Sequence, residues 1–384
     1  MWLSSGSTKI LSTITVKEIF NQKNNFMNFK ESTQFSPLYD SMWKCKRDGK
    51  IKKASVARLV IHGIEECLKL EKEIETNKYK PRKPKTFKLT YPKVRDCSSI
   101  HIRDRIVQRS MNDNVIYPKM TSSFIYDNMA CQKNKGTTTA MDRINTFLHR
   151  YYINNNNSNE GFVWQFDIQG YYKHMKHADA RACFETKLDM ATVDHAEAWL
   201  QRQYPYDIGY EPGSQMVQIL GISLLNPFDH IIKEVCRAKY YLRYMDDGFV
   251  IANTKEELIE LEKVAVKKLA EYGMNFHPKK TNIYPLKNGI KILGFTFKLT
   301  DSGKVIRLIN SQNVKQERKK LVRMAHKVAK GEITVGKYWE CFNAWKAHAE
   351  LGNTYKVVQR MIQYAKQVLK ESLDEKQNKD NRTN

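Results

Sequence analysis

The sequence contains no long apolar run and no closely spaced cysteine pair, and each absence argues against a class of protein. No stretch of about 18 apolar residues occurs, so we expect no membrane-spanning helix. The seven cysteines are an odd number, lie far apart and form no Cys-x-x-Cys pair. This argues against a disulfide framework or a zinc ribbon, and for a reducing compartment such as the cytoplasm. No GxxxxGK[ST] phosphate loop is found, and residues 1–20 do not have the apolar core of a signal peptide.

The 384-residue chain carries far more positive than negative charge. It has 65 Lys and Arg against 41 Asp and Glu, which leaves a formal net charge of +24. An excess of this size indicates a polyanionic partner, because basic side chains that neutralise phosphates release counterions. No single helix gathers the charge against an apolar face, so a nucleic acid is a better candidate than a membrane surface. The alternative is a basic protein whose charge only keeps it soluble.

Patterning divides the chain into four segments. Residues 1–85 are basic and largely helical, and they end in the Pro-broken linker KPRKPK. Residues 86–300 alternate strand-like and helix-like stretches, so we expect an α+β fold there. Residues 301–366 continue into helices with many basic residues. Residues 367–384 are polar, and we expect them to be disordered.

Two adjacent aspartates interrupt an apolar, aromatic stretch, YLRYMDDGFVI. Asp246 and Asp247 fall at the turn of a strand-turn-strand pattern, and Asp167 ends another apolar strand, FVWQF. Neighbouring carboxylates need compensating cations, and two divalent ions about 3.5–4 Å apart are a common solution in phosphoryl-transfer enzymes. Mg²⁺ prefers carboxylate oxygens. The alternative is an ordinary hairpin turn, with Asp167 capping a helix.

The order of motifs around these aspartates resembles that of the reverse transcriptases. The motifs are YPKVRDCSSIHIRDRIVQ (91–108), ACQKNKGTTTAMDRI (130–144), DIQGYY (167–172), PGSQMVQ (212–218), YMDD (244–247), HPKKTNI (277–283) and KILGFTF (291–297). The resemblance implies a right-hand polymerase, with fingers and palm built from an antiparallel palm sheet plus helices, and an α-helical thumb. It also implies RNA-templated DNA synthesis. DIQGYY is similar to the DIKG-aromatic pattern of bacterial members.

The resemblance assigns the catalytic group. Asp167, Asp246 and Asp247 would bind two Mg²⁺ ions, with Mn²⁺ as an alternative. Lys280 would lie near the triphosphate and could act as a general acid for the pyrophosphate leaving group. The alternative for Lys280 is an exposed lysine in a basic protein.

The resemblance also assigns a nucleotide site. Arg95, with Lys93 beside it, would reach the triphosphate, because guanidinium groups suit bidentate phosphate contacts. Tyr172 would be the bulky gate against a ribose 2′-hydroxyl, with the preceding tyrosine in the core. Gly213 and Gln218 belong to the loop that would touch nucleotide and template.

Template and primer contacts are implied at three further places. Lys135 and Gly136 form a basic turn before a helix N-terminus, which suits phosphate. Tyr244 and Met245 would lie under the primer end. Gly294 would belong to the primer-grip hairpin, where backbone matters more than side chain.

One motif departs from the family pattern. Most relatives have QGxxxSP where this chain has PGSQMVQ, so Pro212 replaces Gln, Val217 replaces Ser and Gln218 replaces Pro. Reverse transcriptases of diversity-generating retroelements place an aliphatic residue at the first position and Gln at the last. Gln218 fits that pattern, whereas Pro212 and Val217 do not fit it cleanly.

Three settings therefore stay open. The first is a diversity-generating retroelement, and the second is a defence-associated bacterial reverse transcriptase that acts against phage. The third is a catalytically decayed, basic RNA-binding protein. The partners implied are an RNA template, a DNA or RNA primer and dNTPs, together with a small basic accessory protein or a dedicated non-coding RNA. We expect no membrane partner.

Overall fold

The computed structural model describes residues 26–46, 54–90 and 94–383. Packing groups the chain into two compact units. One consists of residues 1–83, 100–122 and 187–203, and the other of residues 84–99, 123–186 and 204–384. The grouping differs from the four segments expected from patterning, because the N-terminal segment packs with two later stretches of the chain. The division into extension, fingers with palm, thumb and tail stays a proposal.

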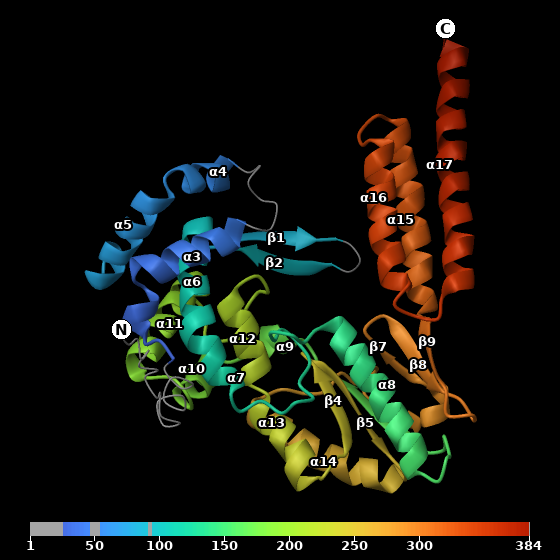
Figure 1. Cartoon of the computed structure of the whole chain (residues 1–384), viewed down its shortest axis with the longest axis horizontal. Helices are drawn as coiled ribbons and strands as arrows, with labels where there is room; N and C mark the ends of the chain where they lie inside the picture. The colour runs from blue at the N-terminus through green and yellow to red at the C-terminus, as the bar shows by residue number, and fades with distance from the viewer. Residues whose placement is uncertain (1–25, 47–53, 91–93, 384) are drawn as a thin grey trace, which may run out of the picture. The chain divides into compact units, whose positions relative to one another are not determined.

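The described part of the first unit consists of helices and the loops between them (Figure 1). Its helices are α2 (Phe29–Ser32), α3 (Phe35–Lys46), α4 (Ala54–Ile61), α5 (Gly63–Glu75), α6 (Ile102–Met111), α7 (Tyr117–Thr121) and α11 (Met190–Gln203), with a π-helical turn at Asn112–Ile116. Helix α3 packs against α5 and α6. Arg103 ties α6 to α5 through ion pairs with Glu66, at 3.2 Å, and Glu73, at 2.9 Å.

The second unit is built on an antiparallel sheet with the strand order β4-β5-β3-β6. The strands are β3 (Phe162–Asp167), β4 (Tyr240–Tyr244), β5 (Asp247–Ala252) and β6 (Asn282–Pro285). Successive side chains along each strand point to opposite faces of the sheet. Helices cover both faces, so the side chains on both are largely apolar. Val163 and Phe249 face the core cluster that includes α8 (Thr137–Asn154). Trp164 faces α14 (Lys255–Glu271), where its indole N–H donates to Glu262 at 3.0 Å.

Short elements surround this sheet. Strands β1 (Lys85–Leu89) and β2 (Arg95–Ser99) form a hairpin, and β7 (Ile290–Ile292), β8 (Phe295–Leu299) and β9 (Val305–Ile309) form an antiparallel sheet. The remaining elements are α9 (Tyr171–His174), α10 (His177–Glu185), α12 (Gln215–Ser223), α13 (Asn226–His230), a π-helical turn at Ile231–Val235 and a 3₁₀ turn at Leu286–Asn288. The strands on both sides of the Asp pair and the helix at 137–152 confirm the expectations from the sequence.

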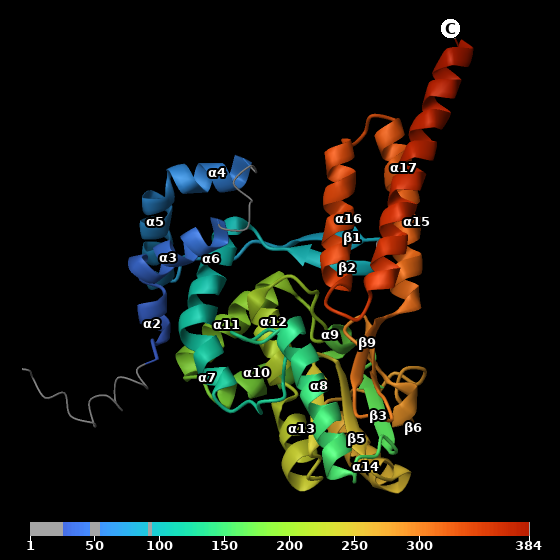
Figure 2. The ribbon, with the colours of Figure 1, turned by 45° about the vertical axis from the view of Figure 1, so that its right-hand side comes forward.

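The C-terminal helices pack on one another, as Figure 2 shows. They are α15 (Ser311–Ala329), α16 (Val335–Ala349) and α17 (Tyr355–Thr383). Phe342 and Trp345 are buried in their shared core, and Trp339 packs against it. Across the described ranges, no helix is both long and apolar enough to cross a membrane.

The prediction that residues 367–384 are disordered is wrong, because the structure has residues 367–383 in a helix. Helix α17 continues through residue 367 to Thr383. Val368 and Leu369 are each 7% exposed, and Ser372 is also buried. The composition of the segment is polar, but its few apolar residues recur at helical spacing and continue the buried stripe of the preceding turns.

Candidate active site

The three aspartates converge at one end of the central sheet. In the antiparallel pair β3–β5, Asp167 lies directly opposite Asp247. Asp246 is in the two-residue turn between β4 and β5, and its carbonyl accepts a hydrogen bond from the Ile168 N–H at 3.0 Å. The pairing of the strands therefore brings together carboxylates that are 80 residues apart in sequence.

The carboxylates destabilise one another's charge. Burial raises the pKa of Asp246, and the charge of Asp167 raises it further. Burial also raises the pKa of Asp247, as do a hydrogen bond with Asp167 and repulsion from both neighbouring carboxylates. Lys280 opposes both shifts, and Arg95 opposes that of Asp246. The site therefore favours added positive charge.

The segment around Lys280 holds Asp167 in place. The Lys280 Nζ lies 2.6 Å from Asp167 Oδ2. The His277 N–H donates to the Asp167 carbonyl at 2.7 Å, and the Asp167 N–H donates to Thr281 Oγ1 at 3.3 Å. Asp167 is thus held through its backbone by His277 and Thr281 and through its side chain by Lys280.

The donor chemistry of the site fits a hard divalent cation. Carboxylate oxygens are the ligands that Mg²⁺ prefers, and crowded carboxylates gain most from such an ion. In the part of the chain that the structure describes, however, no group of three or more His, Cys, Asp and Glu side chains is arranged to hold a metal. Asp167 Oδ2 is engaged by the Lys280 ammonium instead. The residue types fit the ion, whereas the ligand geometry is not formed in advance.

Two of the predicted nucleotide contacts can be placed near this end of the sheet. Arg95 is exposed at the start of β2, and its charge acts on Asp246. Tyr172 is half-buried, and its ring lies against Gly221 of α12. Lys93 lies outside the described residues.

The unusual motif at 212–218 consists of a short loop and the first turn of α12, and its loop is fixed to β2. The Ser98 N–H donates to the Pro212 carbonyl at 3.1 Å. Gly213 has a φ of +149°, and a Cβ there would lie 2.1 Å from the Ser98 carbonyl oxygen, so only glycine fits. Val217 is fully buried, which suits an apolar residue at that position, and Gln218 is exposed.

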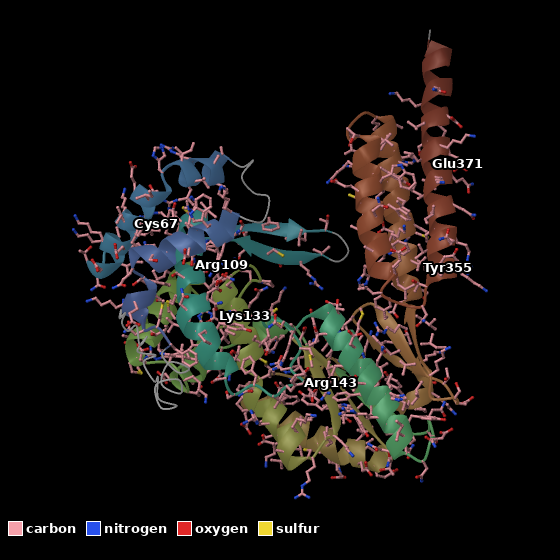
Figure 3. All side chains as sticks on the ribbon, in the orientation of Figure 1. Cys67, Arg109, Lys133, Arg143, Tyr355 and Glu371 are labelled. Carbon is pink, nitrogen blue, oxygen red and sulfur yellow. The ribbon has the colours of Figure 1, made fainter. Side chains whose placement is uncertain are left out.

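Lys135, which the motifs predict to contact the template, donates hydrogen bonds to backbone carbonyls of this chain. Its Nζ donates to the carbonyls of Tyr126, at 2.7 Å, and Asn128, at 3.3 Å. Burial lowers the pKa of this ammonium. Gly136 precedes α8, and the hydroxyls of Tyr244 and Thr137, the first residue of α8, lie 3.3 Å apart. Lys133 belongs to the same loop. Figure 3 labels this lysine and also Arg143 of α8.

Turn geometry accounts for two other predicted residues. Met245 begins the turn that carries Asp246, with a φ of +59° that is uncommon for a side chain of this size. Leu293 and Gly294 form the turn between β7 and β8, with φ values of +55° and +84°. The Gly294 carbonyl accepts from the Asn310 N–H at 3.1 Å, which ties this hairpin to the start of α15.

Comparison with known families decides what kind of protein this is. The model for "Reverse transcriptase (RNA-dependent DNA polymerase)" matches residues 82–297, more than half of the chain. The chain belongs to the reverse transcriptase family. This confirms the right-hand polymerase fold that the motifs implied. No curated protein matches the chain in sequence.

Several solved telomerase structures are similar to this reverse transcriptase at low identity. Apo telomerase from Candida tropicalis lacking its C-terminal domain is 13% identical, with a TM-score of 0.45, over 59% of this chain and 54% of that one. Telomerase from Candida albicans with a TWJ fragment of telomeric RNA is 11% identical, with a TM-score of 0.46, over 75% and 55%. Apo telomerase from Candida tropicalis is 11% identical, with a TM-score of 0.46, over 77% and 58%. The chain thus spans just over half the length of these telomerases.

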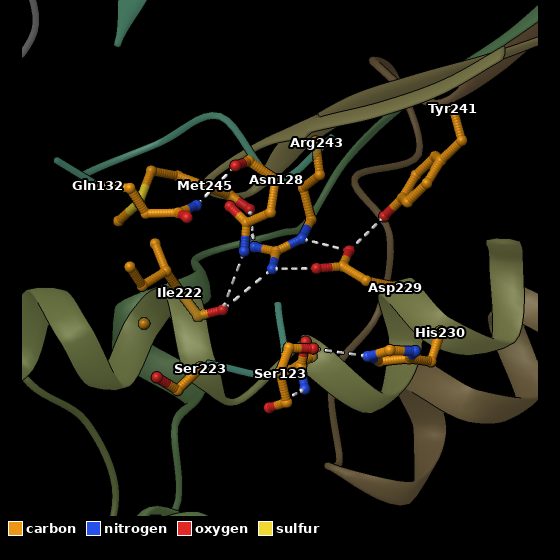
Figure 4. Close-up of polar contacts among 12 residues, drawn as sticks. Ser123, Asn128, Gln132, Ile222, Ser223, Asp229, His230, Tyr241, Arg243 and Met245 are labelled. Carbon is orange, nitrogen blue, oxygen red and sulfur yellow. Dashed lines mark hydrogen bonds and ion pairs between the residues drawn. The ribbon is translucent and has the colours of Figure 1, made fainter. Parts of the chain in front are cut away.

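Motif reading missed a buried ion pair beneath the turn of this reverse transcriptase. Arg243 and Asp229 are both fully buried, and they are joined by two hydrogen bonds of 2.6 Å (Figure 4). The available signal was an arginine inside the apolar run YLRYM, since a buried arginine needs an acidic partner. The sequence alone did not indicate which of the 41 acidic residues that partner would be.

Proposed function

We propose that this protein is an RNA-directed DNA polymerase that makes cDNA by two-metal nucleotidyl transfer. The observation that carries the proposal is the opposition of Asp167 and Asp247, with Asp246 in the adjoining turn. These carboxylates lie within residues 82–297, which the reverse transcriptase family model matches, and in motifs that resemble those of that family. The primer 3′-hydroxyl would bond to the α-phosphorus of the dNTP, and the bond to the β-phosphate would break.

Each predicted residue has a distinct role in this proposal. Asp167, Asp246 and Asp247 would hold two Mg²⁺ ions, or Mn²⁺, which when bound stabilise the attacking and leaving oxygens. Lys280 would donate a proton to the pyrophosphate, and its place beside the aspartates, with Nζ 2.6 Å from Asp167 Oδ2, supports a role at the reacting phosphates. Arg95, with Lys93, would bind the triphosphate, and Tyr172, Gly213 and Gln218 would shape the nucleotide pocket. The crowding of carboxylates supports the metal assignment.

The excess of basic residues supports an RNA template and a DNA or RNA primer as partners. In this proposal residues 1–85 form a basic extension, 86–300 the fingers and palm, and 301–366 the thumb. The thumb would follow the phosphate backbone without reading sequence. Each of the cysteines, all within the described ranges, is free, which supports a cytoplasmic location.

We propose a diversity-generating retroelement as the setting, with phage defence as the alternative. Gln218, which is exposed in the first turn of α12, supports the first. A small basic accessory protein or a dedicated non-coding RNA would complete either assembly. A template and variable repeat pair beside the gene favours diversification, and its absence favours defence. Sequencing the nucleic acid that copurifies with the chain identifies its template.

Primer extension tests the proposed activity. The purified wild type should extend a primer on an RNA template with dNTPs and Mg²⁺. The D246A variant should bind the same primer–template duplex but give no product. Extension by D246A would refute the site. A wild type that binds RNA but never extends a primer would instead indicate the decayed RNA-binding protein.

A further inference from the structure

We propose that Arg243 is a positioning residue that fixes the turn carrying Asp246 and sets it relative to helix α12. This inference rests on the proposed polymerase function and adds a residue that contacts neither substrate nor metal. It starts from one contact: Arg243 Nη1 donates to the carbonyl of Met245 at 2.8 Å (Figure 4). Met245 is the residue before Asp246.

Arg243 reaches the turn from the opposite face of the sheet. Side chains alternate along a strand, so Arg243 shares a face with Tyr241, while Leu242 and Tyr244 face the other way. Asp167 and Asp247 belong to the face of Val163 and Phe249 by the same alternation. The arginine is therefore placed to hold the turn backbone without competing for the carboxylates.

The turn needs such a contact. Met245 is held at a φ of +59°, a conformation that persists only when its surroundings determine it. The guanidinium supplies that constraint, because its planar fork fixes several acceptors at once. The Arg243 backbone is fixed as well: its N–H donates to the Asp127 carbonyl at 3.1 Å, and its carbonyl accepts from the Met129 N–H at 3.0 Å.

The guanidinium is itself rigidly anchored. Its Nε and Nη2 donate to the two oxygens of Asp229, and Nη2 also donates to the Ile222 carbonyl at 3.0 Å. The Tyr241 hydroxyl donates to Asp229 Oδ1 at 2.5 Å. All these groups lie in the second unit and are drawn in Figure 4.

The anchor joins two parts of the proposed active site. Ile222 lies on α12, the helix that begins just after Gly213 and carries Gln218. The side chain of Arg243 thus connects α12, which carries Gln218, to the turn that carries Asp246. Releasing the Met245 carbonyl should move Asp246 relative to that helix while leaving the duplex-binding surface intact.

The R243K variant tests the role. Lysine keeps the charge that Asp229 needs, but one ammonium cannot serve Asp229, Ile222 and Met245 together. The turnover number for dNTP addition should fall by about 10- to 100-fold. The KM for dNTP and the Kd for primer–template should change by less than about twofold. Mn²⁺ affinity, measured by electron paramagnetic resonance without substrate, should weaken by about 10-fold.

The Y240F variant is the matched control. It removes a hydroxyl on the same strand that accepts a hydrogen bond from the Asn154 side chain at 2.8 Å, and it leaves the contact between Arg243 and Met245 intact. Its turnover number and Mn²⁺ affinity should match the wild type, even where its urea midpoint falls as far as that of R243K. Wild-type turnover in R243K, or equal losses in the two variants, overturns the proposal.

A second variant covers the case in which R243K does not fold. R243M/D229L removes both buried charges together, a change that buried ion pairs often tolerate, and it also lacks the donor to Met245. It should show the same loss of turnover and of Mn²⁺ affinity, and wild-type values would overturn the inference. A wild type without extension activity refutes the proposed function instead, and the Mn²⁺ measurement still decides the role of Arg243.

Discussion

Asp167 and Asp247 face each other across the β3–β5 pair, and burial together with the negative charges of Asp246 and Asp167 raises the pKa of the Asp247 carboxyl. Each carboxylate therefore makes the ionised form of its neighbour less favourable. The arrangement is therefore stable only when a proton, Lys280 or a bound cation offsets the repulsion. Without such compensation, repulsion between the aspartates lowers the free energy of unfolding of the protein.

The first prediction separates the effect of Asp247 on stability from its effect on primer extension. D247N keeps the shape of the side chain, removes one of the crowded charges and can donate to Asp167. We expect its unfolding temperature in the presence of a chelator to equal or exceed that of the wild type. Primer extension should fall below about 1% of wild type, because a metal ligand and its charge are lost.

D374N is the matched control, since Asp374 is exposed on α17. Neither its unfolding temperature nor its extension activity should change. A D247N protein that is less stable than the wild type in chelator would show that the carboxylates are not crowded.

The second prediction concerns Lys280, whose ammonium lies 2.6 Å from Asp167 Oδ2. If it donates the proton to pyrophosphate, K280A should lower the turnover number by about 100-fold, the low end for loss of a general acid. Duplex affinity should be unchanged. Single-turnover kinetics of dNTP addition measure the step directly.

K279A provides the comparison, because Lys279 is the exposed neighbour in the same HPKKT segment. It removes the same charge from the same turn and should retain wild-type turnover. Equal losses in K279A and K280A would assign Lys280 to the general positive field of a basic protein.

Much of the site was accessible from the sequence because its signals are local. Apolar strands that end in aspartate predicted where Asp167, Asp246 and Asp247 would lie, and the register of β3 and β5 brings them together. The helix after Gly136 and the hairpin around Asp246 follow from patterning in the same way. Family motifs then supplied the expected roles.

What could not be predicted depends on contacts distant in sequence. Nothing local pairs Arg243 with Asp229 or directs Lys135 to backbone carbonyls. The tail was misjudged because its overall polarity hid the buried positions Val368 and Leu369, which matter only once α15 and α16 are beside them. The packing of residues 187–203 with the N-terminal helices likewise has no local signal.

The third prediction addresses fidelity. Pro212 is exposed, and its carbonyl accepts from the Ser98 N–H, a bond that glutamine can keep, so P212Q should leave the loop folded. It restores the glutamine that most relatives carry, and a tighter contact with nucleotide and template should lower the misincorporation rate. Sequencing of extension products from both proteins measures this, and indistinguishable error spectra would sink the idea that the loop loosens base selection.

The last prediction tests the close approach of the loop to β2. In G213A the new methyl group would meet the Ser98 carbonyl, and the backbone would hold an unfavourable φ of +149°. The free energy of unfolding should therefore fall by about 1 to 3 kcal/mol, measured by urea denaturation with an unchanged m value. G136A is the control, because Gly136 has an extended φ of 176° and no atom within 4 Å of the added carbon. Its unfolding free energy should stay within about 0.5 kcal/mol of wild type. Equal effects at the two glycines would mean that the contact with Ser98 does not constrain the loop.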